Sequence, residues 1–193
     1  MIESIDYEIG RLLRTIRNDQ KENTLIIFLG DNGTPGKIAQ APYENNRSKG
    51  SLYQGGIHVP LVISGPLVTR KGERDQSLIH TADIFSTIAE AAVISESKYF
   101  NSQSFYNTLS NSTLSARVYN YSEILDNDKP AKSGFTIRNE RYKLIVLDNN
   151  SYRFYYLKND PLEKNNLING NLSIELENIL DKLIIEASNF RKK

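Results

Sequence analysis

Hydrophobic residues in the first third of the chain follow two different spacings. Residues 2–17 place aliphatic side chains three or four positions apart, the pattern of an amphipathic helix with one buried face: Ile2, Ile5, Ile9, Leu12, Leu13 and Ile16. Residues 25–29 and 59–63 instead form uninterrupted apolar runs. Such runs are typical of strands that are covered on both faces. We therefore expect a central, largely parallel strand at 25–29, with the first helix packed on the sheet beside it.

A second helix is predicted within residues 78–92. We expect Thr81 to be its N-cap and Asp83 to lie in its first turn. One face of this helix is apolar and should be buried, and it consists of Ile84, Phe85, Ile88 and Ala92.

From residue 117 onward the hydrophobic period changes to two. This alternation predicts four strands, at 117–123, 134–138, 142–147 and 152–157, with hairpin turns at 139–141 and 148–150. Helical spacing then returns in a closing helix that contains Leu172, Leu176, Ile179, Leu180, Leu183 and Ala187. The end of the chain is therefore predicted to be a small antiparallel sheet packed on a C-terminal helix.

These elements together predict an α/β fold in which part of a mixed sheet with flanking helices is followed by that small sheet. We divide the chain into an α/β part at 1–97, a connecting segment rich in Ser and Asn at 98–116, and a C-terminal subdomain at 117–193. A chain of 193 residues, 39% of them hydrophobic, is large enough to bury a core.

Composition excludes several classes of function. The chain has 24 basic and 23 acidic side chains, a net charge of +1, and no stretch approaches the ~20 apolar residues of a membrane-spanning helix. We therefore expect neither nucleic acid nor membrane as a partner. The chain has no cysteine, which excludes disulfides and thiol chemistry and leaves the cellular compartment open.

Candidate chemistry begins directly after the run at 25–29. Gly30-Asp31-Asn32-Gly33 would place a carboxylate and an amide side by side at the carboxyl end of a strand, where open α/β sheets place their sites. Residues 33–57 show no convincing helix or strand pattern, and a loop of this length within a compact domain is usually functional. The loop contains Lys49 and the pair Gly55-Gly56, at which the backbone can turn or approach a ligand closely.

Three landmarks in this order resemble the C-terminal half of the type I sulfatases, in the alkaline phosphatase superfamily. The first is the helical segment 1–13, and the second combines Asp31-Asn32-Gly33 with the segment KGSLYQGGIHVP at 49–60. The third is YLKNDPLEKNNL at 156–167, which resembles a late loop of that family. The resemblance implies an alkaline-phosphatase-like mixed sheet, followed by the small antiparallel sheet and helix.

The resemblance also implies roles for individual residues. Asp31 and Asn32 would be metal ligands, and their hard oxygen atoms suit Ca²⁺, with Mg²⁺ as the alternative. Lys49 would be both catalytic and substrate-binding, through contacts with a sulfate oxygen and the leaving-group oxygen. In the family, two further aspartates and a formylglycine nucleophile complete the site from an N-terminal part. We expect that part to be missing here, because the chain contains no Cys or Ser followed by X-Pro-X-Arg.

The function implied is hydrolysis of sulfate monoesters, on a sulfated small molecule or a sulfated glycan. We expect the chain alone to be inactive and to need the missing N-terminal half of the domain. The family resemblance favours a periplasmic or extracellular location for the parent protein. Two alternatives stay open: a phosphatase or phosphodiesterase of the same superfamily, against which Asn32 argues, and a non-catalytic sulfatase-like binding module.

Two positions depart from the family pattern. His58 stands where arginine is usual and Gln54 where glutamate is usual, which suggests that an ion pair supporting the loop is missing. The other histidine, His80, is interpreted as a structural or surface residue.

Overall fold

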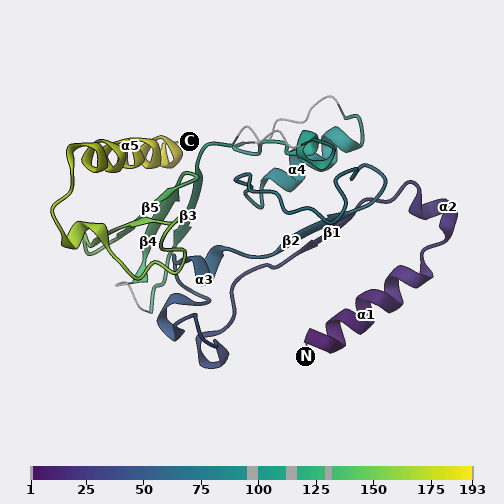
Figure 1. The fold of residues 1–193 in the computed structure, drawn as a ribbon, viewed down its shortest axis with the longest axis horizontal. Helices are drawn as coiled ribbons and strands as arrows, with labels where there is room; N and C mark the ends of the chain where they lie inside the picture. The colour runs from purple at the N-terminus through teal and green to yellow at the C-terminus, as the bar shows by residue number, and fades with distance from the viewer. Residues whose placement is uncertain (1, 95–99, 112–116, 129–131, 193) are drawn as a thin grey trace.

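The computed structural model describes residues 2–94, 100–111, 117–128 and 132–192. Within these ranges the chain forms a two-stranded sheet, of β1 (Ile26–Leu29) and β2 (Leu61–Ser64), and a four-stranded sheet, of β3 to β6. Figure 1 shows the two sheets in separate parts of the molecule, with the C-terminal helix beside the larger one.

The small sheet differs from the predicted parallel arrangement. β1 and β2 run antiparallel, with Ile27 opposite Ile63 and Phe28 opposite Val62. Phe28 is 43% exposed and Val62 58% exposed, so one face of this sheet is open to solvent. The prediction of a parallel strand covered on both faces is therefore wrong for this pair. An apolar run indicates which residues tend to be buried, but it does not indicate the direction of the neighbouring strand.

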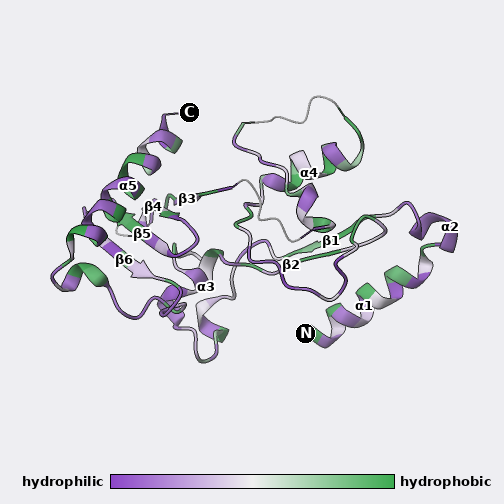
Figure 2. Ribbon diagram, turned by 45° about the horizontal axis from the view of Figure 1, so that its top comes forward, coloured by the Kyte–Doolittle hydropathy of each residue, from purple (hydrophilic) through white to green (hydrophobic). Residues whose placement is uncertain are grey.

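Helix α1 (Ile2–Thr15) forms where predicted but does not pack on the sheet as expected. None of its residues is buried, and Ile2 and Leu12 are 83% and 63% exposed. Figure 1 shows α1 set apart from β1 and β2, and the short helix α2 (Asn18–Lys21) lies at the bend that connects α1 to β1. The hydrophobic stripe of α1, visible in Figure 2, is not covered by another element among the described residues.

Helix α4 (Asp83–Ala91) buries a different face from the one its apolar residues predict. Phe85 and Ile88 are 50% and 48% exposed, whereas Asp83, Ser86, Thr87 and Ala89 are buried. The N-cap is Ala82 rather than Thr81. The polar face turns inward because it receives hydrogen bonds from the following segment, which includes the 3₁₀ helix η3 (Tyr106–Leu109).

The larger sheet confirms the predicted architecture of the C-terminal part. β3 (Asn120–Ile124), β4 (Gly134–Arg138), β5 (Tyr142–Leu147) and β6 (Tyr152–Tyr156) follow one another as an antiparallel meander. Helix α5 (Ile174–Arg191) covers one face, and its N-cap Ser173 accepts a hydrogen bond from the Leu176 amide. The core under this helix contains Ile137, Leu144, Val146, Phe154, Leu183 and Ala187.

The opposite face of the larger sheet is covered by the loop that follows β1. Leu52 is 3% exposed and packs with Ile145, Tyr155 and Leu157. The loop is shaped by three short helices, η1 (Gly36–Ile38), η2 (Asn45–Arg47) and α3 (Gln54–Ile57). A further 3₁₀ turn, η5 (Leu167–Asn169), precedes α5. Among the described helices, none has the length and apolar character needed to cross a membrane.

Candidate functional site

Asp31 and Asn32 lie in the turn that leaves β1. The Gly30 amide donates to Pro60 O over 3.0 Å, and the Gly33 amide donates to Gly56 O over 2.9 Å. These two bonds fasten the turn, on both sides of Asp31 and Asn32, to the chain that enters β2. The Asp31 side chain is exposed and Asn32 is half-buried. Neither side chain has a hydrogen-bond or ion-pair partner among the described residues, so their oxygen atoms are free to bind a ligand.

Lys49 is brought next to this turn through its backbone. The Lys49 amide donates to Thr34 O over 2.9 Å, three residues beyond Asp31. The Lys49 side chain is exposed, and the structure shows no ion pair for its ammonium group within the described ranges. The fold therefore brings the backbones of the three predicted site residues into one region, although Asp31 and Asn32 precede the loop and Lys49 lies within it.

The two backbone segments approach each other too closely for side chains. A Cβ atom at Gly33 would overlap Gly55 O, and one at Gly56 would overlap Ser51 O. Glycine is required at these positions because any larger residue would push the Asp31 turn away from the Lys49 segment. The close approach predicted for Gly55-Gly56 is present, and in this structure it is made to protein backbone.

The late loop at 156–167 reaches the same region through Glu163. The Glu163 Oε2 atom accepts a hydrogen bond of 2.6 Å from the Gln54 amide, and Oε1 lies 2.6 Å from Lys143 Nζ. Both side chains are buried, at 0% exposure for Lys143 and 2% for Glu163. Arg47 Nη1 donates to Glu163 O over 2.6 Å. Glu163 therefore connects α3 and the loop before it to the larger sheet.

This ion pair was not predicted from the sequence, because each charged residue, taken alone, is typical of a solvated surface. One signal was present: Lys143 lies in a strand whose other residues are mostly apolar, at a position next to Leu144 and Ile145. Burial is the main reason why the pKa of Lys143 is lowered to about 8, and the Glu163 carboxylate opposes that shift.

The two departures from the family pattern lie at the two ends of α3. Gln54 is buried, and its backbone N–H donates a hydrogen bond to the Glu163 carboxylate. The backbone N–H of His58 donates to Gln54 O over 2.8 Å. The pKa of His58 is lowered by partial burial and by the nearby cations of Arg138 and Lys143. The neutral imidazole is thus favoured over a second cation beside the buried Lys143.

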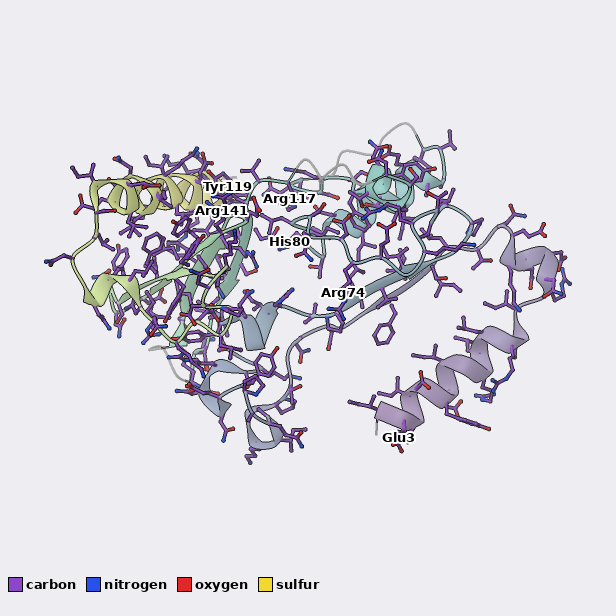
Figure 3. All side chains as sticks on the ribbon, viewed as in Figure 1. Glu3, Arg74, His80, Arg117, Tyr119 and Arg141 are labelled. Carbon is purple, nitrogen blue, oxygen red and sulfur yellow. The ribbon has the colours of Figure 1, made fainter. Side chains whose placement is uncertain are left out.

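A second buried ion pair fixes α4. Arg117 Nε donates to Asp83 Oδ2 over 2.6 Å, and Arg117 Nη2 also contacts Asp83 Oδ1. The amides of His80 and Gln103 donate to the same carboxylate over 2.7 and 2.9 Å. Figure 3 shows Arg117 and His80 together in the connection between α4 and the larger sheet. Asp83 is therefore engaged on both oxygen atoms, which makes it a structural residue.

Metal-binding capacity within the described ranges is limited to a partial ligand set. No group of three or more His, Cys, Asp or Glu side chains is arranged there to hold an ion. Asp31 and Asn32 supply a carboxylate and an amide carbonyl, which fit a hard cation such as Ca²⁺. Ca²⁺ takes roughly 6 to 8 oxygen ligands, so these two residues can form only part of its shell.

Comparison with known proteins gives a consistent result. A family model described as Sulfatase matches residues 1–94. An arylsulfatase of Clostridium perfringens is 26% identical over all of this chain and 39% of the relative, and one of Klebsiella aerogenes is 30% identical over 51% of this chain and 29% of the relative. A sulfatase of Formosa agariphila is 31% identical over 47% of this chain and 18% of the relative.

Solved structures share the fold. A protein solved in complex with its substrate D-glucosamine-2-N,6-O-disulfate superposes with a TM-score of 0.80 at 21% identity, over 99% of this chain and 39% of that one. The PsFucS1 sulfatase from Pseudoalteromonas sp. gives a TM-score of 0.62 at 21% identity, over 86% and 36% of the two chains.

These similarities relate the chain to a family of hydrolases. More narrowly, residues 1–94 match the sulfatase family model, and the chain aligns with a C-terminal portion of sulfatases. The chain spans between 18% and 39% of the length of the three curated relatives named above.

Proposed function

We propose that this chain supplies the metal-binding turn, and the lysine that stabilises the leaving group, of a hydrolase that cleaves sulfate monoesters: R–O–SO₃⁻ + H₂O → R–OH + HSO₄⁻. The observation that carries the proposal is the pair of backbone hydrogen bonds, Gly33 to Gly56 and Lys49 to Thr34. They hold a carboxylate, an amide and an ammonium group, none of which has a partner within the described part of the chain, in one region of a sulfatase-like fold.

In this proposal Asp31 and Asn32 hold Ca²⁺, with Mg²⁺ as the alternative, through one carboxylate and one amide oxygen. The cation supplies positive charge that favours attack at the sulfur atom. The Lys49 ammonium binds a sulfate oxygen and stabilises the negative charge that develops on the ester oxygen as the S–O bond breaks. Exposure of the Lys49 side chain leaves it free to reach a bound ester.

The nucleophile must come from elsewhere in this proposal. The sequence has no cysteine and no serine followed by X-Pro-X-Arg, the motif that is converted to formylglycine in the family. We propose that the N-terminal half of the same domain is the required partner and supplies the formylglycine together with two further aspartates. The chain alone should then be inactive.

The proposed substrate class is a sulfated sugar. One structural neighbour is described with D-glucosamine-2-N,6-O-disulfate as its substrate, and another is described in complex with k-i-k-neocarrahexaose. Among curated relatives, an ulvan-active sulfatase of Formosa agariphila aligns with 99% of this chain at 24% identity. These names support a sulfated glycan over an unrelated sulfate ester.

The first test uses the purified chain. Calorimetry should show millimolar or weaker Ca²⁺ binding, at the weak end of the range of ~10⁻⁹ to 10⁻³ M, because two ligating residues form an incomplete shell. Binding should be lost in Asp31→Ala and kept in Lys49→Ala. The same preparation should not hydrolyse p-nitrophenyl sulfate. Micromolar Ca²⁺ binding, or metal-dependent turnover above a blank, would contradict the assignment.

The second test uses the chain joined to an N-terminal sulfatase half that carries the formylglycine motif. Asp31→Ala should abolish turnover through loss of the metal. Lys49→Ala should keep the metal and slow turnover by roughly 10²-fold or more, as removal of one transition-state donor typically does. Lys37→Ala is the matched control, because Lys37 is an exposed lysine of the same loop, outside the site. Full activity in Asp31→Ala would refute the proposed ligand, and faster cleavage of a phosphate ester would favour a phosphatase.

A further inference from the structure

Glu163 has an unusual conformation for its residue type. Its φ angle is +57°, in the left-handed region that glycine and asparagine tolerate and other residues rarely adopt. This backbone conformation is strained for glutamate, so favourable interactions of the side chain must offset the strain. The side chain is the one that reaches the Gln54 amide and Lys143.

A continuous series of contacts leads from this carboxylate to the predicted metal ligands. Glu163 Oε2 accepts from the Gln54 amide at 2.6 Å, which fixes the first residue of α3. The turn of α3 then sets the position of Gly56, whose carbonyl oxygen accepts from the Gly33 amide at 2.9 Å. Gly33 directly follows Asn32. The contact with Glu163 spans 109 residues of sequence, so no local preference of the loop replaces it.

The other contacts of Glu163 keep the carboxylate in place. Lys143 Nζ lies 2.6 Å from Oε1 and has no other polar partner among the described residues, so this ion pair is its compensation for burial. Arg47 binds the Glu163 carbonyl oxygen at 2.6 Å from the same loop that contains Lys49. The late loop is thus attached at one side to the larger sheet and at the other side to Arg47 and Gln54, which lie before and after Lys49 in the sequence.

We propose that Glu163 is a positioning residue for the sulfatase site: its carboxylate holds α3 so that the turn containing Asp31 and Asn32 stays aligned with the Lys49 segment. This inference rests on the proposed function for the roles of Asp31, Asn32 and Lys49. The positioning itself is a property of this chain and can be measured without metal, substrate or turnover.

The test compares two double variants that differ in a single acceptor. Lys143→Met with Glu163→Gln removes both charges but keeps a carbonyl oxygen for the Gln54 amide. Lys143→Met with Glu163→Leu removes both charges and the acceptor. Replacing a buried ion pair by apolar residues of similar volume is often neutral for overall stability. The two variants should therefore have similar cores and differ at α3.

Backbone amide exchange, followed by NMR, reports the effect at each position. In the Leu variant the Gly33 and Gln54 amides should exchange about tenfold faster than in the Gln variant, the factor expected for loss of one hydrogen bond. The Ile145 amide in β5 should exchange equally in both, because it reports on the core. If Glu163 only filled space, the Gln and Leu variants would protect the Gly33 amide equally. Greater protection of Gly33 in the Gln variant would therefore show that the hydrogen-bond acceptor matters.

Asp160→Asn is the matched control. Asp160 accepts hydrogen bonds from the amides of Lys164 and Asn165 within the same late loop, and it does not contact α3 in the described structure. Its substitution should leave the Gly33 amide unchanged. Should the Leu variant fail to fold, Glu163→Gly in the Lys143→Met background replaces it, because glycine suits the backbone angle and lacks the acceptor.

Two outcomes would overturn the proposal. Equal exchange at Gly33 in the two double variants would show that α3 holds its position without the acceptor. Equal acceleration at Gly33 and Ile145 would show that Glu163 acts only on overall stability. Neither outcome depends on metal binding or sulfatase activity. The positioning role of Glu163 and the proposed function can therefore fail independently, and the experiments distinguish the two failures.

Discussion

The two sheets of this molecule bury their apolar residues to very different degrees. In the four-stranded sheet, Ile137, Leu144 and Phe154 are fully buried, whereas Phe28 and Val62 of the two-stranded sheet are 43% and 58% exposed. Figure 2 shows hydrophobic residues along β1 and α1, which lie outside the compact C-terminal part. The residues proposed for chemistry belong to the less packed region, and the contact through Glu163 ties them to the well-packed one.

The largest expected effect is on the free energy of unfolding, when an aromatic side chain is truncated in each of the two sheets. Phe154→Ala should lower the free energy of unfolding by about 3 to 5 kcal/mol, because a fully buried aromatic side chain leaves a cavity. Phe28→Ala removes the same atoms from an open face and should cost less than about 1.5 kcal/mol. Urea unfolding followed by circular dichroism would measure both, and similar losses would show that the two sheets are equally packed.

The ion pair between Asp83 and Arg117 should contribute nearly as much to the free energy of unfolding, because it joins α4 to the segment that leads into β3. Asp83→Asn keeps the size of the side chain but leaves the Arg117 guanidinium buried without a counter-ion, which should cost about 3 kcal/mol. Glu8→Gln, at a pair with Arg11 in which both side chains are exposed, is the control and should cost less than about 1 kcal/mol. The same urea experiment applies, and a loss below 1 kcal/mol for Asp83→Asn would refute a role for the pair in stability.

Self-association should come from the open side of the small sheet. Phe28, Val62 and the apolar stripe of α1 are all exposed, and exposed apolar surface promotes association. The purified chain should therefore form concentration-dependent assemblies in light scattering. Phe28→Ser combined with Val62→Ser should reduce them, whereas Leu125→Ser, at an exposed site beyond β3, should not. A monodisperse wild-type monomer with a sharp cooperative melt would contradict this prediction.

Acid should destabilise the fold modestly through His80. Burial and the nearby Arg117 cation lower the pKa of His80 below 6.5, and its Nδ1 atom accepts a hydrogen bond from the Ala82 amide. As the pH falls below 6.5, the unfolded chain takes up a proton that the folded chain disfavours, so stability decreases. His80→Asn should reduce the dependence of the urea midpoint on pH between 7.5 and 5.5, values that bracket the ordinary histidine pKa of ~6.5, and His58, whose pKa is also lowered, should keep part of it. An unchanged slope would show that His80 does not contribute.

The C-terminal sheet is the part of the fold that local sequence patterns predict well. The ranges of β4 and β5 agree with the predicted strands, and the turn at 139–141 forms because Asn139 Oδ1 accepts hydrogen bonds from the amides of Arg141 and Tyr142. Strand alternation and turn chemistry are both local, so a single sequence suffices for them.

The errors concern features that depend on distant segments. The polar face of α4 is buried because residues such as Phe105 and Arg117 bind to it, and no pattern within 83–91 contains that information. The direction of β2 and the exposure of α1 likewise depend on what lies beside them. For the site, the sequence predicts which residues gather around the turn after β1, but it does not predict that Glu163 and Lys143 hold α3. The roles of Asp31, Asn32 and Lys49 stay predictions.

The connectivity of the molecule also bears on the order in which it folds. Strands β3 to β6 pair only with their neighbours in sequence, and such local contacts form early because little chain entropy is lost in closing short loops. The hydrogen bond from Gln54 to Glu163 closes a loop of 109 residues and can form only after the late loop has settled on β5. We therefore expect the C-terminal sheet to act as a template during folding, and the turn that carries Asp31 and Asn32 to reach its final geometry last.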